Sequence, residues 1–216
     1  MLAPSSGPVA ETSSGPRASG RIGAFLAHAP VSSALCGVFF IGLFAVAAAP
    51  GLLRVFALVP SDLVRPTAWY RLATFALVQG SIRHLVWVAG ILLASGWLAE
   101  RWLDRRTMWI VAAAASVISG MCYTLLDPTG PPAIGGGFIA AGFAGAAVAT
   151  STMRRNAVTR GGKLTCLVLL LLYGLTPLRP DPQSLAMLAA FIAAGGFAAW
   201  RLRSRGDTTS TREHAV

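Results

Sequence analysis

Histidine and charge are both scarce in this chain. Its 216 residues contain only three histidines, His28, His84 and His214, and only 12% of its residues are charged. Together with a mean hydropathy of +0.63, this low charge excludes a disordered chain and is atypical of a soluble domain. We therefore expect a protein that is embedded in a membrane.

Cysteine is equally rare. Cys36, Cys122 and Cys166 all lie in apolar stretches, with neither the spacing of metal ligands nor the context of a disulfide-bonded domain. We expect them to pack as small apolar side chains, and we expect no metal site and no cofactor.

The apolar residues, which make up 55% of the chain, gather in six runs. The runs cover residues 31–49, 81–99, 107–126, 133–150, 164–178 and 184–200. A helix needs about 20 apolar residues to cross a bilayer, so the runs predict an all-α membrane protein with six transmembrane helices. Residues 1–30 have the composition of a disordered tail, and residues 201–216 that of a basic, polar tail. A cleaved signal peptide is the alternative for the first run, although its Pro-rich leader would be unusually long.

The formal net charge of +10 comes from 18 basic and 8 acidic residues. With the N-terminus in the cytoplasm, most basic residues lie there too: Arg17, Arg21, Arg101, Arg105, Arg106, Arg154, Arg155, Arg160, Lys163, Arg201, Arg203, Arg205 and Arg212. Basic loops stay in the cytoplasm, so this distribution favours both termini inside. The basic residues are scattered over separate loops without an aromatic stacking motif, so we expect the lipid bilayer and not nucleic acid as a partner.

Residues 50–80 form the longest predicted loop, on the outer side of the membrane. The loop is rich in apolar side chains, among them Leu52, Phe56 and Trp69. We expect it to form short amphipathic pieces that lie in the membrane interface.

Small residues recur at intervals of four in two of the runs. One stripe consists of Gly137, Ala141, Gly145 and Ala149, and the other of Ala186, Ala190, Ala194 and Ala198. Such stripes let membrane helices approach each other closely. Generic packing of Ala-rich helices explains them as well as a specific site does.

Several short motifs follow one another between Tyr70 and Gly145. They are Tyr70-Arg71, the segment from Gln79 to His84, Glu100 followed by Arg105-Arg106, and Gly135-Gly136-Gly137-Phe138. In order and spacing, this stretch resembles the rhomboid intramembrane serine proteases. The resemblance implies a rhomboid-like bundle of six spans, in which a serine on the fourth span and a histidine on the sixth cleave peptide bonds.

Some of the rhomboid pattern is kept and some is altered. The positions that the resemblance marks as structural are Tyr70, Arg71, Glu100, Gly135, Gly142, Gly145, Ala190 and Ala194. His84 matches the histidine of the family's H-x-x-x-N motif, which helps to stabilise the oxyanion. Val88 stands where that motif has asparagine, and Gln79 stands where many members have another histidine.

The two catalytic positions depart from the family. The resemblance places Gly137 at the nucleophile position and Met187 at the base position. Whatever the alignment, the chain has no histidine between residues 85 and 213 and no serine between residues 127 and 149. Without a hydroxyl and an imidazole no acyl-enzyme forms, so we expect no catalytic residue. We also expect the bulk of Phe138 and Met187 to fill part of the former catalytic cavity.

His84 leaves three alternatives open. It could form an unorthodox dyad with Ser81, Ser116 or Ser119, keep a contact to a bound peptide, or form a hydrogen bond within the outer loop. The sequence does not decide among them.

The resemblance therefore predicts a pseudoprotease that binds single-span membrane proteins as clients. The composition, rich in Ala, Gly and Arg, suits a bacterium with a high GC content, so we expect the protein in a bacterial plasma membrane. One alternative is a working rhomboid serine endopeptidase, which family membership alone would assign. The other is a small multi-span transporter or a structural membrane protein. The client and the oligomeric state stay open.

Overall fold

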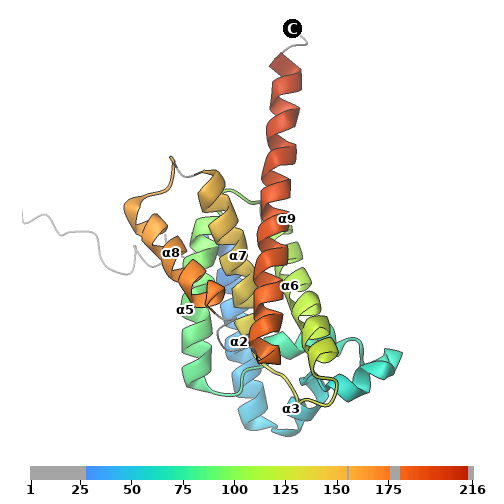
Figure 1. Cartoon of the computed structure of the whole chain (residues 1–216). Helices are drawn as coiled ribbons and strands as arrows, with labels where there is room; N and C mark the ends of the chain where they lie inside the picture. The colour runs from blue at the N-terminus through green and yellow to red at the C-terminus, as the bar shows by residue number, and fades with distance from the viewer. Residues whose placement is uncertain (1–27, 155, 176–180, 214–216) are drawn as a thin grey trace, which may run out of the picture.

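The computed structural model describes residues 28–154, 156–175 and 181–213. Within these residues the chain is helical and has no β-strand, which confirms the all-α class. The six long helices are α2 (Pro30–Ala48), α5 (Ile82–Ala99), α6 (Arg105–Leu126), α7 (Gly137–Met153), α8 (Arg160–Gly174) and α9 (Pro182–Glu213). Figure 1 shows them as an up-and-down bundle from which α9 projects beyond the other helices at its C-terminal end.

Four helices are long and apolar enough to cross a membrane: α2, α5, α6 and the Pro182–Ser204 part of α9. Helix α7 is also apolar but has 17 residues. Helix α8 has 15 residues. Each of the six apolar runs of the sequence thus corresponds to a helix, and four of these helices satisfy the length and composition of a membrane span.

Polar caps explain where α6 and α9 begin. The Asp104 carboxylate accepts a hydrogen bond from the Thr107 N–H at 2.7 Å, so α6 starts two residues before the apolar run. Asp181 accepts bonds from the Ser184 hydroxyl at 2.6 Å and from its N–H at 2.9 Å. These bonds, the hydroxyl bond first, hold the pKa of Asp181 below its ordinary value.

Two helix boundaries differ from those that the apolar runs predict. Helix α7 begins at Gly137 and not at residue 133, because Pro131 and Pro132 precede it and Gly135 has a φ of +112°. Helix α9 continues to Glu213, although residues 201–216 have the composition of a polar tail. The end of the apolar run at residue 200 therefore does not mark the end of the helix.

The segment between α2 and α5 consists of short helices, as expected. They are α3 (Gly51–Phe56), η1 (Pro60–Val64), η2 (Pro66–Ala68), α4 (Arg71–Thr74) and η3 (Phe75–Leu77). Val55, Val64 and Trp69 are exposed on this segment, while Leu58 and Phe75 are fully buried. The segment therefore packs on the bundle with one side and presents apolar groups on the other.

Helix α7 lies at the centre of the bundle and contacts α5, α6, α8 and α9. A Cβ on Gly142 would overlap the Cβ of Ala115 on α6. A Cβ on Gly145 would overlap the carbonyl oxygen of Phe191 on α9. The facing residues of α9, Ala190 and Ala194, are buried. The small-residue stripes thus bring the backbones of α7 and α9 into direct contact.

Glu100 joins the end of α5 to the start of α2. Its carboxylate accepts hydrogen bonds from the Val31 N–H at 2.9 Å, the Ser32 N–H at 2.9 Å and the Ser32 hydroxyl at 2.6 Å. Free N–H groups at a helix start need such acceptors, and a negative charge suits the positive end of the helix dipole. A family position noted in the sequence therefore has a structural role here.

We expect Glu100→Ala to lower the free energy of unfolding by about 2 to 4 kcal/mol, because three hydrogen bonds to a charged group are lost. Glu100→Gln keeps one carbonyl acceptor and should lose about half as much. Unfolding in mixed detergent micelles, followed by circular dichroism, measures both. Wild-type stability of the Ala variant would contradict this role of Glu100.

Candidate functional site

Three helix starts meet at one end of the bundle. His84 lies on the first turn of α5, Gly137 is the first residue of α7, and Met187 lies on the second turn of α9. A Cβ built on Gly137 would lie 3.7 Å from the Met187 Sδ, 3.9 Å from the His84 Cε1 and 4.0 Å from the His84 Nε2. Three positions that are far apart in the sequence thus converge on one point.

A cavity of about 240 Å³ lies beside Gly137. Its lining includes His84, Trp87, Phe138, Tyr173, Gln183 and Met187. Phe138 and Met187, which we expect to fill part of the space, both lie in its wall, and a cavity large enough for several atoms remains beside them. The Phe138 ring packs on Phe75 at a centroid distance of 5.1 Å, which holds much of its bulk against the core.

A larger cleft of about 790 Å³ lies next to this cavity. The two share His84, Trp87, Ile134 and Gln183 as lining residues. The cleft also has Arg83 in its wall. A ligand could thus extend from the apolar surroundings of Gly137 to a more polar rim.

The serines considered as partners of His84 are engaged elsewhere. The Ser116 hydroxyl donates to the Leu72 carbonyl at 2.8 Å, and the Ser119 hydroxyl donates to the Ala115 carbonyl at 2.6 Å. The Ser81 oxygen accepts the backbone N–H of His84 and caps α5. Within the described residues the His84 imidazole makes no hydrogen bond, and only the backbone N–H of His84 is bonded, to Ser81.

Gln79 is an unusual buried side chain behind the site. It is fully buried, and within the described residues neither its Oε1 nor its Nε2 has a hydrogen-bond partner. A Cβ on Gly136 would lie 2.8 Å from the Gln79 Nε2, and one on Gly135 would lie 2.9 Å from the His84 Nε2. The amide and the imidazole therefore press against consecutive glycines, which must lack side chains.

Val88 is almost completely buried in the core. It lies one turn after His84 on α5 and also lines the cavity. An isopropyl group here can neither donate nor accept a hydrogen bond. The polar contribution that an asparagine would make on this face of α5 is therefore missing.

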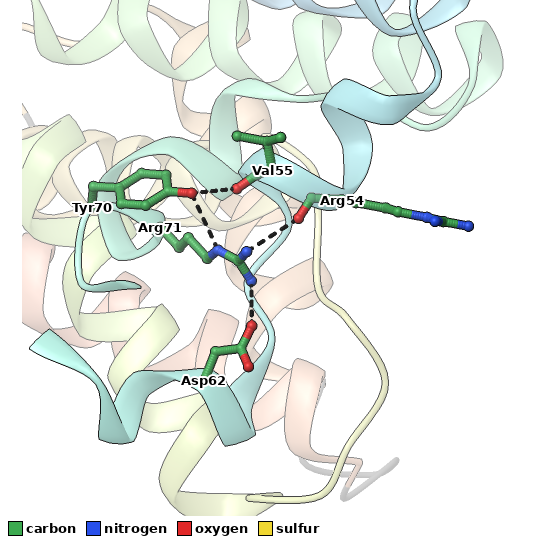
Figure 2. Close-up of polar contacts among 5 residues, drawn as sticks. All are labelled: Arg54, Val55, Asp62, Tyr70 and Arg71. Atoms are coloured by element: carbon green, nitrogen blue, oxygen red, sulfur yellow. Dashed lines mark hydrogen bonds and ion pairs between the residues drawn. The ribbon is translucent and has the colours of Figure 1, made fainter. Parts of the chain in front are cut away.

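Tyr70 and Arg71 hold the segment between α2 and α5 together (Figure 2). Arg71 donates to the Asp62 carboxylate at 2.7 Å and to the Arg54 carbonyl at 3.2 Å. The Tyr70 hydroxyl donates to the Val55 carbonyl at 2.8 Å and lies 3.5 Å from the Arg71 Nε. One guanidinium thus connects α3, η1 and α4, and its position is structural.

We expect Arg71→Ala to expose residues 50–80 to limited proteolysis at least about fivefold faster than in the wild type, because a charge-assisted pair and a backbone bond are lost. Arg65→Ala, at an exposed position in the same segment, is the matched control and should digest at the wild-type rate. Equal digestion rates for the two variants would show that Arg71 does not secure the segment.

Several residues that line the cavity were not predicted from the sequence, among them Trp87, Tyr173 and Gln183. Trp87 is 60% exposed and lies three positions after His84, so helical spacing alone could have placed it on the same face. Tyr173 and Gln183 come from other helices, and nothing in their local sequence marks them.

A bundle of apolar helices, four of which are long and apolar enough to cross a membrane, is typical of a helical membrane protein. The model of the rhomboid domain matches residues 66–205, which include His84, Gly137 and Met187. The chain therefore belongs to the rhomboid family. No curated protein matches it.

Proposed function

We propose that this protein is a rhomboid pseudoprotease, a family member that binds single-span membrane proteins without cleaving them. The observation that carries the proposal is which residues stand at the two catalytic positions, where α5, α7 and α9 meet. Position 137 has no side chain, and position 187 carries a thioether beside it. A thioether cannot accept a proton from a hydroxyl at neutral pH, and there is no hydroxyl at 137 to give one.

In this proposal all six long helices cross the plasma membrane of a bacterium, and both termini lie in the cytoplasm. The placement of 13 of the 18 basic residues on one side supports the orientation. Helix α7, with 17 residues, reaches the lower limit for a span. Because other helices surround it, little of α7 needs to match the thickness of the lipid.

The binding surface for a client helix would be the groove between α5 and α8. The groove has a volume of about 610 Å³ and is lined mainly by apolar side chains, including Trp87, Ile91, Val168 and Leu172. Trp87, Ile91 and Leu172 also line the cavity beside Gly137. Part of a transmembrane segment bound in the groove could therefore enter the cavity. In an active rhomboid protease this cavity would hold the peptide bond that is cleaved.

A photo-crosslinking residue at position 168 tests client binding in intact membranes. Position 41 on α2 is the matched control, since Ile41 is apolar and 71% exposed but lies outside the groove. We expect one or a few single-span proteins to crosslink from 168 and not from 41. Identical products from both positions, or none from 168, would contradict the client-binding proposal.

Family membership also favours a working serine endopeptidase. That function needs a nucleophile and a base at the cavity, and neither 137 nor 187 provides one. A transporter that is coupled to protons or ions needs ionisable groups deep in the spans. Arg83, His84 and Glu100 all lie at ends of α5, which argues against ion coupling.

A further inference from the structure

A second cavity lies between α6 and α9, toward the other end of the bundle. It has a volume of about 350 Å³ and is lined by Arg106, Ile110, Phe197, Trp200 and Arg201. Arg201 follows Met187 by 14 positions on α9, about 21 Å at the rise of an α-helix. This cavity is therefore separate from the candidate client site.

The lining combines two cations with an apolar wall. Ile110 is 42% exposed and Trp200 is 58% exposed. The Phe197 and Trp200 rings lie 5.7 Å apart, and the Arg201 guanidinium lies 5.9 Å from the Trp200 ring. A ligand that fits both parts carries a negative group at one end and hydrocarbon at the other.

The positive charge in this cavity is only partly balanced. Arg201 lies 4.0 Å from the Asp104 carboxylate and 3.4 Å from the Thr107 hydroxyl. Its buried Nε has no hydrogen-bond partner within the described residues. Arg106 makes no ion pair within that same part of the chain. The Asp104 carboxylate, at the longest distance that counts as an ion pair, is the one negative group near the two guanidiniums among the described residues. The cavity therefore keeps a net positive charge.

We propose that this cavity binds the headgroup of an anionic phospholipid. The phosphate lies between Arg106 and Arg201, whose guanidiniums suit bidentate contacts to phosphate oxygens. The acyl chains run along Ile110, Phe197 and Trp200, and a tryptophan is favoured at this depth of the interface. Basic pockets between transmembrane helices are suited to such headgroups.

The test is native mass spectrometry of the purified full chain with phosphatidylglycerol or phosphatidylcholine added at matched concentrations. We expect phosphatidylglycerol to bind more tightly, and Arg106→Gln and Arg201→Gln each to weaken that binding about tenfold, as the loss of a charged hydrogen bond does. Arg105→Gln and Arg203→Gln are the matched controls. They remove the same charge from neighbouring exposed positions outside the cavity and should bind as the wild type does.

Two results would overturn the proposal. Equal weakening by the cavity variants and the controls would mean that net charge alone attracts the lipid, and equal binding of the two lipids would mean that no anionic site exists. Since Arg201 also contacts Asp104 and Thr107, its variant could lose stability. If thermal unfolding shows such a loss, the proposal is tested by comparing how tightly Arg106→Gln and Arg105→Gln bind phosphatidylglycerol.

Discussion

A chain that carries Gly137→Ser and Met187→His together reacts covalently with a fluorophosphonate probe, whereas the wild-type protein does not. The geometry favours this result, because a Cβ at 137 would lie in ordinary van der Waals contact, 3.7 Å from the Met187 Sδ. An imidazole at 187 has about the reach of the thioether that it replaces. His84, 3.9 Å from the same Cβ, would stand beside the reacting serine.

We expect the double variant to be labelled at least about a hundredfold faster than the wild type or Gly137→Ser alone, since a positioned general base contributes about 10² to 10⁴ in rate. Gly137→Ala with Met187→His is the matched control, which has the base without the nucleophile and should stay unlabelled. A correctly folded double variant that stays unlabelled would mean that residues 137 and 187 do not form the remnant of a catalytic site.

Gly145→Ala destabilises the bundle by about 3 kcal/mol or more, the upper part of the range for overpacking, because the new Cβ meets rigid backbone. A Cβ at 145 would overlap the Phe191 carbonyl, so α7 and α9 must separate along their whole contact. Two packed helices cannot yield locally as a flexible side chain can.

Gly196→Ala provides the comparison. A Cβ at Gly196, on the exposed side of α9, would meet nothing within 4 Å. Alanine is the better helix former, so this variant should unfold at or slightly above the wild-type denaturant concentration. Equal stability of the 145 and 196 variants in a detergent unfolding titration would show that the α7–α9 contact does not depend on glycine.

Much of the fold could be predicted from the sequence, because burial in lipid requires apolar runs and each run forms one helix. The boundaries were harder to predict. Pro131, Pro132 and Gly135 delay α7, and α9 continues through the polar residues 201–213. Composition predicts which segments are apolar enough to lie in lipid. Hydrogen bonding and backbone geometry decide at which residue each helix begins and ends.

The candidate site also has features that the sequence predicts and features that only tertiary packing decides. The convergence of His84, Gly137 and Met187 follows from the family pattern, since it depends on the arrangement of helices that the pattern encodes. The cavity that remains beside Gly137 could not be predicted, because it depends on how the Phe138 ring packs against Phe75. The Gln79 amide, which has no hydrogen-bond partner among the described residues, is likewise a result of tertiary packing that no local sequence reveals.

The central claim is that the native chain does not cut peptide bonds. The most direct measurement incubates the purified wild-type protein in detergent with a model transmembrane substrate, beside a catalytically competent rhomboid as a positive control. We predict that the substrate stays intact with this protein while the control cleaves it. Cleavage by the wild-type chain that a serine-directed inhibitor abolishes would contradict the account.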